Sequence, residues 1–326
     1  MASRWLRQKQ IVHVPPRHGW WVSHAQLPTV LPLAPDRWRI FCAGRDVRNR
    51  GSIIRVDVDP TRGMTVLDIS RDRPVRHGPR GSFDCDGLGV TSVVAAGNGH
   101  LFTSAGMNAT DTTPYRIAIG LMSSDDQGRS FARRGNGPIL QAGANNPAGC
   151  SSGQIVRIGR RWHLWFSSWR GWDHAEGQPP EPIYDIRHAV SRDAKLWHQD
   201  ANPAIAPRSP KEGGLARPWV MQNDQGFEMW YSIRSRAAAG DPAQPRYRLG
   251  YATSRDGLSW ERRDADHGFD NPPQPGDWDH AMQCYASVIR SGGRDHMFYC
   301  GNDYGRFGFG HALRVKKTVQ QNRIMP

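Results

Sequence analysis

The sequence predicts an all-β fold, a five-bladed β-propeller built as a single domain over residues 1–326. The first observation is a repeat, because an aromatic-rich strand recurs five times with its closing aromatics 61, 64, 65 and 68 residues apart. The second is composition, since 13 Trp, 35 Gly and 24 Pro favour short strands and tight turns over long helices. The closing aromatics are Phe41, Phe102, Phe166, Tyr231 and Tyr299.

Each unit of about 65 residues is expected to hold three or four antiparallel strands. An innermost strand lies nine to eleven residues before each closing aromatic, and a third strand follows it. The blades are placed at approximately 15–75, 76–140, 141–207, 208–268 and 269–318. The innermost strands are centred on Val30, Val93, Val156, Val220 and Val288, and the third strands cover 52–56, 115–120, 184–189, 248–252 and 307–312.

A turn marker follows the third strand in three of the units. Asp126, Asp193 and Asp256 each stand two residues after a serine, and an aromatic residue follows four or five positions later. The first copy resembles the Asp-box of sialidases. Because these aspartates recur in blade after blade, we interpret them as turn-forming residues and exclude them from the site.

The N-terminus supplies the strand that the last unit lacks. No comparable fourth strand follows residue 315, whereas Arg4-Trp5 resembles Ser259-Trp260, which opens the outer strand of an earlier unit. Residues 4–12 are therefore predicted to form the outer strand of the last blade and to close the ring, which removes an open sheet edge.

The charge and the cysteine content limit the classes of binding partner that the sequence allows. The formal charge is +13, but the basic residues are scattered and only five of the 43 are lysine, so nucleic acid is not favoured, while a phosphorylated substrate stays open. Five cysteines lack zinc spacing. The start has no apolar secretory segment and no stretch approaches the roughly 18 apolar residues of a membrane helix. These features predict a cytoplasmic protein with no membrane span.

Two segments carry a family resemblance. Residues 229–231 (Met-Trp-Tyr), followed by 248–260, resemble the blade signature of the superfamily of arabinanases, invertases and levansucrases. Residues 298–312 resemble its closing blade. The resemblance implies a five-bladed propeller of glycoside hydrolase type. It also implies an enzyme that acts at a glycosidic bond, in a pocket where the inner strands converge on the central axis.

The candidate site residues stand where the chain enters each inner strand, because the innermost strand of a blade lines the central channel. Glycoside cleavage needs one carboxylic acid to protonate the leaving oxygen and a second carboxylate as nucleophile or base. The catalytic candidates are Asp86, Glu212 and Asp279, and the substrate-binding candidates are His24, Asp84, Ser152, Arg217, Trp278, His280 and Tyr285.

The catalytic residues of the resembled superfamily do not carry over position by position. Its members generally take the nucleophile or base from blade one and the acid from blade three, where this chain offers Ser23 and His24, and Asn and Ser. Glu212 is assigned as the acid, because its Gly-Gly-Leu-Ala neighbourhood is apolar. Asp86 or Asp279 would then be the base.

The sequence therefore predicts a carbohydrate-active enzyme that cleaves or transfers at a glycosidic bond of a sugar or glycoconjugate. One alternative is a glycosyltransferase or phosphorylase that uses a phosphorylated or nucleotide sugar, which the missing acid in blade one and the surplus arginine favour. Another is a non-catalytic propeller that binds a glycan or scaffolds a complex. No cofactor and no metal ligand set is predicted; Asp and His could hold Ca²⁺, but no spacing indicates it.

Overall fold

The computed structural model describes residues 3–13, 19–174, 179–236 and 246–315, and these residues are almost entirely β-structure. The helical segments among them are the four-residue α1 (Asn302–Gly305) and short 3-10 turns such as Pro60–Arg62. No helix in the described ranges has the length and apolar character that a membrane span requires. The all-β prediction is confirmed, although the predicted start of the first blade at residue 15 lies outside the described residues.

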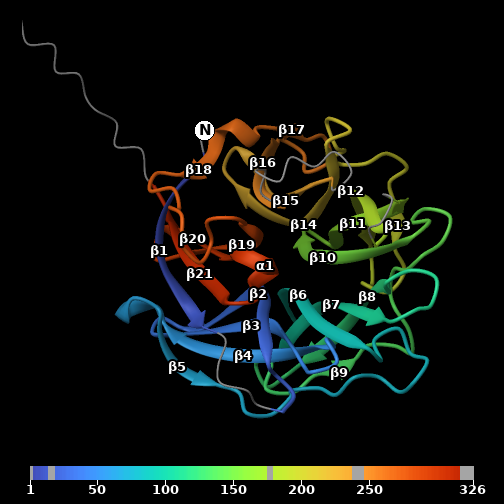
Figure 1. Ribbon diagram of the computed structural model, residues 1–326, viewed down its shortest axis with the longest axis horizontal. Coiled ribbons are helices and arrows are strands. Elements are labelled where there is room, and N and C mark those ends of the chain that lie inside the picture. Colours follow the sequence, from blue (N-terminus) through green and yellow to red (C-terminus); the bar gives the residue numbers. More distant parts are fainter. Residues whose placement is uncertain (1–2, 14–18, 175–178, 237–245, 316–326) are drawn as a thin grey trace, which may run out of the picture.

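The first two sheets are four-stranded antiparallel meanders (Figure 1). Consecutive strands pair through tight turns, which is the simplest way to satisfy the backbone of short alternating segments. The first sheet holds β2 (Ser23–Ala34), β3 (Arg37–Arg45), β4 (Gly51–Asp59) and β5 (Thr65–Ile69). The second holds β6 (Gly87–Ala96), β7 (Gly99–Asn108), β8 (Arg116–Ser124) and β9 (Ala132–Arg133).

The third sheet has eight strands in two antiparallel halves. The halves meet through a single parallel pair, Tyr184 with Gly214. The first half holds β10 (Gly149–Ile158), β11 (Arg161–Asp173), β12 (Glu181–Ser191) and β13 (His198–Gln199). The second half holds β14 (Glu212–Asn223), β15 (Gly226–Ser235), β16 (Tyr247–Ser254) and β17 (Glu261–Arg262).

The last sheet joins the two ends of the chain, and we call it the closing sheet. Its strands, in spatial order, are β18 (His267–Phe269), β1 (Ser3–His13), β21 (Gly308–Arg314), β20 (Arg294–Cys300) and β19 (Cys284–Ser291). β1 runs antiparallel to β21, and the short β18 lies outside β1 in parallel. The prediction that residues 4–12 form an outer strand of the last sheet is therefore confirmed.

Trp5 anchors this N-terminal strand. Its side chain is fully buried, and its ring meets that of Trp230 edge-on at 5.9 Å between centroids. The indole nitrogens of both tryptophans donate to the hydroxyl of Ser3, at 2.8 and 2.9 Å. Trp5 thus joins the closing sheet to the second half of the third sheet, as its likeness to the earlier blade tryptophan indicated.

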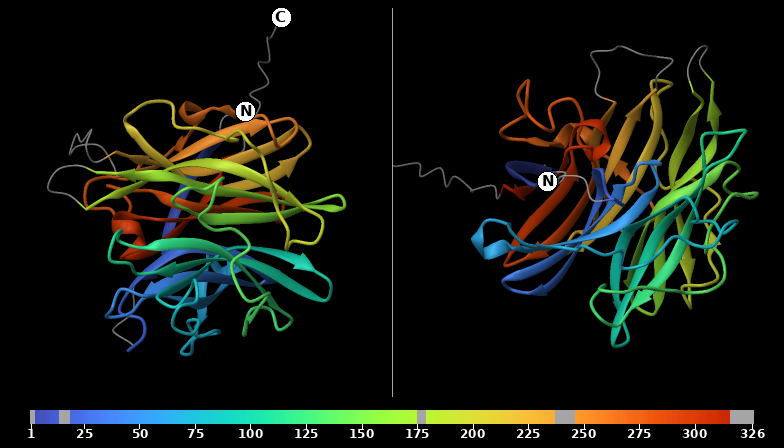
Figure 2. Two further views of the ribbon diagram at one scale, coloured as in Figure 1. Left: turned by 90° about the vertical axis from the view of Figure 1, so that its right-hand side faces the viewer. Right: turned by 60° about the horizontal axis from the view of Figure 1, so that its bottom comes forward.

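Figure 2 shows the sheets lying beside one another. Buried apolar clusters join each sheet to the next. Phe131, which follows the first turn marker, packs between Phe41 of the first sheet and Phe102 of the second, at 5.7 and 4.8 Å. The first sheet also packs on the closing sheet, because Trp38 meets Phe298 at 6.2 Å. The packing therefore runs around the whole ring.

The three marker aspartates form turns. Asp126 accepts hydrogen bonds from the backbone N–H groups of Arg129 and Ser130, at 2.9 and 3.0 Å. Asp193 and Asp256 make the equivalent bonds two and three residues ahead. These bonds support the interpretation of the markers as structural turns.

Buried histidine makes the fold sensitive to acid. His311, in β21, is 4% exposed and forms a hydrogen bond with His296, 3.1 Å between ring nitrogens. Burial, followed by the charges of His296 and Lys9, lowers the pKa of His311 from 6.5 to about 3. Between these values the unfolded chain binds a proton that the folded chain does not, so stability falls as the pH drops through this window.

We expect the free energy of unfolding, measured in urea at pH 7, 6 and 5, to fall on acidification. The slope should be shallower in His311→Gln by up to about 1.4 kcal/mol per pH unit, which corresponds to one proton. The exposed His198, replaced in the same way, serves as the control. An unchanged slope in His311→Gln would contradict the assignment.

Candidate functional site

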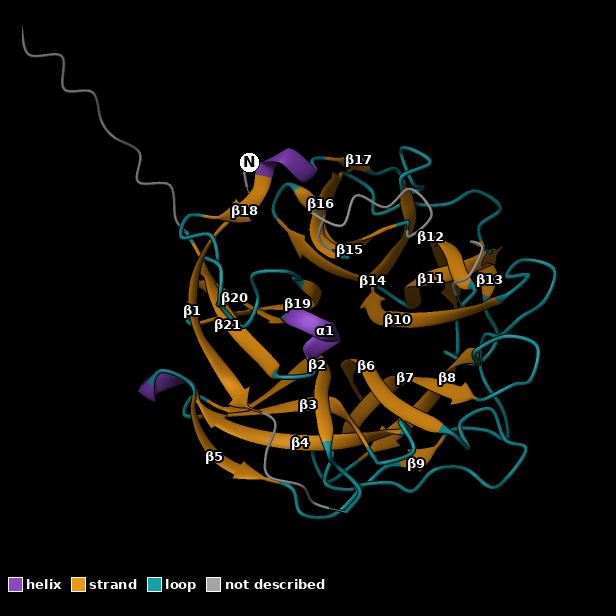
Figure 3. Cartoon of the chain, viewed as in Figure 1, coloured by secondary structure: helices purple, strands orange, loops and turns teal. Residues whose placement is uncertain are grey.

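A cavity of about 480 Å³ lies at the centre of the ring, where the innermost strands begin. Figures 1 and 3 show these strands, β2, β6, β10, β14 and β19, gathered around α1 near the centre. The volume lies in the range typical of small-molecule sites. Each innermost strand contributes to the wall, through Leu27, Gly89, Ser152, Ala216 and Tyr285 respectively.

The innermost strands are bulged at this level. Their pairing with the next strand shifts register, for example between Ser151 and Gln154 of β10 and between Ala216 and Trp219 of β14. Bulges of this kind re-aim side chains, and strained backbone of this kind is concentrated at functional sites. The residues with positive φ at these bulges are His24 (62°), Leu27 (58°), Ser152 (54°), Arg217 (49°) and Tyr285 (57°).

Tyrosines from the third strands form a large part of the wall. Tyr115 stands just before β8, Tyr184 lies in β12 and Tyr247 begins β16, so successive units bring the same residue type to the cavity. The hydroxyls of Tyr184 and Tyr247 form a hydrogen bond with each other. The ring of Tyr247 packs against Tyr285 and Tyr304, at 5.5 and 5.8 Å. Such rings offer flat faces and hydroxyl groups to a polar ligand.

These phenols are protonated at neutral pH. Burial raises the pKa of Tyr115 to about 12, and burial also raises the pKa values of Tyr184, Tyr247 and Tyr285. Their hydroxyl groups are therefore available as hydrogen-bond donors, not as anions.

Arg234, in β15, ties the cavity wall together. Its side chain is 4% exposed, and it donates to the hydroxyl of Tyr184 at 2.9 Å and to the carbonyl of Gly213 at 3.0 Å. It also donates to the carbonyl of Pro182 and forms an ion pair with Glu181. One planar guanidinium thus joins β12, β14 and β15.

Glu181 is the one carboxylate among the described lining residues of this cavity. Besides Arg234 it pairs with Arg246, whose Nε lies 3.4 Å from the hydroxyl of Tyr304. The side chain of Glu181 stays 22% exposed. It is therefore held by two guanidinium groups and still reaches the cavity.

A third guanidinium, that of Arg45 in β3, also lines the cavity. It donates to the side-chain oxygen of Gln26 at 3.0 and 3.1 Å and to that of Asn49 at 2.8 Å. Both partners are neutral amides. Burial lowers the pKa of Arg45.

Ser152 and Tyr285 are the predicted site residues that the structure places in the lining of this cavity. Arg217 lies in the same ring of bulges but is 1% exposed. The other seven candidates stand outside the cavity lining, and their proposed roles stay predictions.

Glu212 is surrounded by arginine, not by the apolar neighbourhood expected of an acid. Arg262 contacts its carboxylate at 2.8 and 2.9 Å, and the backbone N–H of Arg208 donates to it at 2.8 Å. Burial, which opposes ionisation, is outweighed by these hydrogen bonds, and the pKa of Glu212 is lowered. The side chain is thus poised to stay ionised, whereas a general acid must hold a proton.

Asp279 and Asp84 are buried partners of arginine. Asp279 is fully buried and accepts from Arg7 at 2.8 and 3.0 Å and from the hydroxyl of Tyr299 at 2.6 Å. Asp84 is 1% exposed and pairs with Arg133 at 2.7 Å. These ion pairs stabilise the closing sheet, which contains Arg7, and the second sheet, which contains Arg133.

Asp86 and His24 lie at strand entrances beside the cavity. Asp86 directly precedes the lining residue Gly87 and accepts from the backbone N–H of Ala109 at 3.0 Å. His24 has a φ of 62° and bonds to the hydroxyl of Ser23 at 2.8 Å. Burial, followed by the charges of Arg45 and Arg306, lowers the pKa of His24 to about 3, so its ring is neutral at pH 7.

Trp278 and His280 stand in the loop between β18 and β19, beside the closing sheet. Trp278 packs on Tyr299 at 5.3 Å and against Gly301 and Gly310. A side chain at either glycine would clash with the Trp278 ring. His280 is exposed. Trp278 is thus placed to stabilise the closing sheet by packing.

Sequence reasoning found Tyr285 but missed the other tyrosines and the arginines of the wall. A signal was present, because tyrosine recurs at the start of the third strand in three successive units: Tyr115, Tyr184 and Tyr247. The predicted carboxylates all stand at the entrances of innermost strands. Glu181 and Arg234 stand on other strands and Arg246 directly precedes β16, at positions that no spacing distinguishes.

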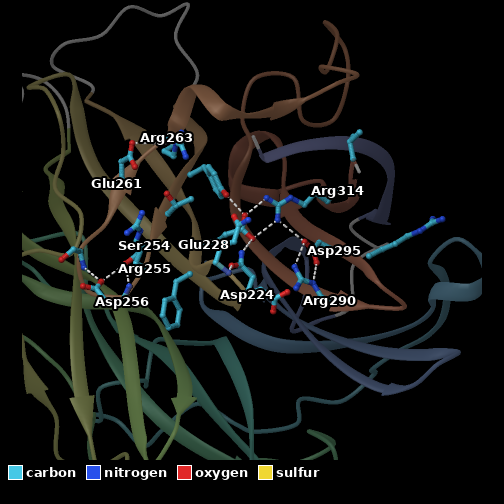
Figure 4. Close-up of a pocket in the computed structure, with 18 of the residues that line it drawn as sticks. Asp224, Glu228, Ser254, Arg255, Asp256, Glu261, Arg263, Arg290, Asp295 and Arg314 are labelled. Carbon is cyan, nitrogen blue, oxygen red and sulfur yellow. Dashed lines mark hydrogen bonds and ion pairs between the residues drawn. The ribbon is translucent and has the colours of Figure 1, made fainter. Parts of the chain in front are cut away.

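A second, larger groove of about 1470 Å³ lies between the second half of the third sheet and the closing sheet (Figure 4). Its charged groups neutralise one another: Glu228 pairs with Arg314 at 2.5 Å, and Asp295 pairs with Arg290 and Arg314 at 2.7 and 3.2 Å. Figure 4 shows Glu228 of β15 linked to Arg314 of the closing sheet, and Asp295 linked to Arg314 and Arg290 within that sheet. Such satisfied pairs hold two sheets together.

Metal ligands do not gather in the part of the chain that the structure describes: no three His, Cys, Asp or Glu side chains there lie together as a metal ion would require.

Solved structures resemble the chain over nearly its whole length. A BT0996 RGII complex matches with a TM-score of 0.71 at 16% identity, and the match covers 99% of this protein and 95% of the other. A structure from "the GH130 family of mannoside phosphorylases" matches with a TM-score of 0.70 at 13% identity, covering 98% and 95%. "A thermostable family-43 glycoside hydrolase" matches with 0.61 at 16% identity, covering 94% of each. At these identities the likeness shows the fold, and it confirms the resemblance to glycoside hydrolase-like propellers.

Sequence relatives are nearer. No family model matches the chain. "Uncharacterized protein Rv1502" of Mycobacterium tuberculosis H37Rv is 33% identical over 294 residues, which cover 90% of this chain and 93% of that protein. "Uncharacterized protein MT1551" of strain CDC 1551 matches equally, at 33% over 294 residues. The chain therefore belongs to the family of Rv1502, and its fold is that of the glycoside hydrolase-like β-propellers.

Proposed function

We propose that the protein is a carbohydrate-active enzyme that cleaves or transfers at a glycosidic bond, with the sugar bound in the central cavity. The observation that carries the proposal is the wall of this cavity, where tyrosine rings, hydroxyl groups and a carboxylate converge in about 480 Å³. Aromatic faces with a few placed polar groups are what a sugar ring requires. The names of the similar folds point to the same chemistry by analogy.

We also propose that the sheets make five blades. The eight-stranded sheet counts as two blades, since a single residue pair joins its four-stranded halves. Five bulged innermost strands around one cavity fit this count. The predicted boundaries near residues 75, 140 and 207 then fall between β5 and β6, β9 and β10, and β13 and β14. The boundary placed at 268 falls inside β18, and because β18 pairs with β1 in the closing sheet, the last blade would begin after β17.

A second candidate is transfer to or from phosphate. Hydrolysis in most glycosidases uses two carboxylates on either side of the bond. The described lining of the cavity offers Glu181 alone, beside three guanidinium groups. In phosphorolysis, phosphate replaces the attacking water, so one protein carboxyl suffices for proton transfer. This observation favours a phosphorylase or a transferase over a simple hydrolase.

The test is a turnover screen of nitrophenyl glycosides and oligosaccharides, with and without inorganic phosphate, and of glycosyl phosphates. In the active combination we expect Glu181→Gln to lower kcat/KM by about 100-fold or more, because its ionised carboxylate, paired with Arg234 and Arg246, is the lining group that can accept a proton from an attacking hydroxyl. Glu212→Gln is the matched variant outside the lining and should retain turnover.

The two variants separate the assignments. Normal turnover in Glu181→Gln with loss in Glu212→Gln would return the acid role to Glu212, as the sequence predicts. Saturable glycan binding without any turnover across the screen would instead identify a non-catalytic glycan-binding propeller.

A further inference from the structure

Two arginines at the central cavity lack a carboxylate partner. Elsewhere in the described chain, buried arginines are paired: Arg39 with Asp57 at 2.7 Å and Arg262 with Glu212 at 2.8 Å, for example. Arg45 and Arg217 form no ion pair with any described carboxylate. The charges of Arg45 and Arg217 are therefore not neutralised by a described carboxylate, whereas those of Arg39 and Arg262 are.

One segment of β2 holds both guanidinium groups. Gln26 accepts two hydrogen bonds from Arg45, while the carbonyl of Pro28 and the hydroxyl of Thr29 accept from Arg217 at 2.8 and 2.9 Å. Leu27, between these acceptors, lines the cavity. Arg45 and Arg217 thus approach one four-residue stretch of β2 from two different strands, Arg45 at its first residue and Arg217 at its last two.

Arg217 is incompletely bonded. Its side chain is 1% exposed, yet its Nε and Nη1 have no hydrogen-bond partner among the described atoms. Its backbone is held at a φ of 49° before Pro218, an arrangement that an L residue adopts only under constraint. Its ring neighbour is Trp219, 5.7 Å from the guanidinium carbon.

Leaving these cations unneutralised is costly. A buried charge without a counter-ion costs several kcal/mol in desolvation. Burial lowers the pKa of Arg217 to about 10, so the group still carries its charge at neutral pH. Tyr285, which lines the cavity, lies within electrostatic range of both arginines. An anion bound on this side of the cavity would therefore neutralise the positive potential of the two guanidinium groups.

We propose that the cavity contains an anion-binding subsite at the β2 segment Gln26–Thr29, where Arg45 contacts the anion and Arg217 stabilises it from behind. The ligand class is an oxyanion, a phosphate or a carboxylate, because the planar guanidinium of Arg45 matches two oxygens at once. The subsite rests on the proposed function in one respect: the anion is a substituent of the bound sugar or a phosphate co-substrate.

The experiment measures binding by thermal shift and calorimetry at constant ionic strength. The probes are inorganic phosphate, glucose 1-phosphate, glucuronate and, as the neutral reference, glucose. We expect phosphate or glucose 1-phosphate to raise the Tm of the wild type while glucose leaves it unchanged. Binding of glucuronate but neither phosphate compound would assign a carboxylate sugar, and binding of phosphate alone would assign a co-substrate.

Arg45→Gln is the test variant, because it removes the charge and keeps a hydrogen-bonding group. We expect its Kd for the bound probe to rise at least tenfold, or about 1.4 kcal/mol. Arg192→Gln removes the same charge from an exposed turn and should change Kd less than twofold. Arg217→Met, similar in length, tests the buried cation and should also weaken binding.

Several results would overturn the subsite. One is equal weakening in Arg45→Gln and Arg192→Gln, which would show diffuse charge. Another is failure of all three anions to bind the wild type. Turnover of neutral glycosides that is unchanged in Arg45→Gln would leave the proposed function standing and remove the subsite. Arg45-dependent anion binding without glycoside turnover would do the reverse.

Discussion

Replacing Asp279 with alanine is expected to lower the free energy of unfolding by about 3–5 kcal/mol, because one partner of a buried ion pair is removed. Asp279 is fully buried, and its two oxygens accept three hydrogen bonds, two from Arg7 and one from Tyr299. Without the carboxylate, the half-buried guanidinium of Arg7 on β1 loses its main partner. Urea unfolding at pH 7 measures the change.

Asp277→Ala is the control for this variant. Asp277 contacts the same guanidinium nitrogen of Arg7, at 3.0 Å, but its side chain is 39% exposed. Its loss should leave the urea midpoint almost unchanged, since exposed ion pairs contribute little. If Asp279→Ala kept wild-type stability and lost turnover, the catalytic role predicted for Asp279 would be supported instead.

Arg234→Lys is expected to cost about 3 kcal/mol of stability and to weaken sugar binding, although the charge is retained. The guanidinium bonds to four groups at once: Glu181, Tyr184, Pro182 and Gly213. A lysine ammonium is a single point with a different reach, so most of these buried acceptors lose their donor. Urea unfolding and a thermal shift with the active sugar measure both effects.

Arg248→Lys provides the matched control. Arg248 lies on the neighbouring strand β16, directly opposite Ile233, and its side chain is 46% exposed beside Glu212 at 3.3 Å. The exchange there should change neither the midpoint nor the binding. A tolerated Arg234→Lys would mean that charge alone, and not the shape of the fork, holds the cavity wall.

Much of the fold could be predicted from the sequence because strand periodicity and packing residues are local signals. The five valines marked the innermost strands, since alternation places every second residue inward. The likeness of Trp5 to Trp260 also identified a pairing between the two ends of the chain. The shared edge of the eight-stranded sheet was not predicted, because one parallel pair between Tyr184 and Gly214 leaves no pattern.

The site was harder to predict, because carboxylates look alike in sequence whether they react or brace the fold. Glu212 and Asp279 occupy the expected strand entrances, yet their surroundings depend on Arg262 and Arg7, which are 50 and 272 residues away along the chain. Arg217 and Tyr285 could be predicted because both stand where the chain enters an innermost strand. Glu181 lies in the third strand of its unit and Arg234 in the second strand of the next, so the position of the innermost strands does not predict them.

The pairing of β1 with β21 imposes an order of events on biosynthesis. Trp5 aligns with Arg314, so this contact spans almost the entire chain. Contacts of such high sequence separation form slowly, since the entropy of closing a long loop is lost before the contact contributes any favourable free energy. Because β1 leaves the ribosome long before β21, it waits without this partner, with Trp5 uncovered, until β21 emerges. During that interval the nascent chain offers an exposed tryptophan and a free strand edge to chaperones and to other nascent chains.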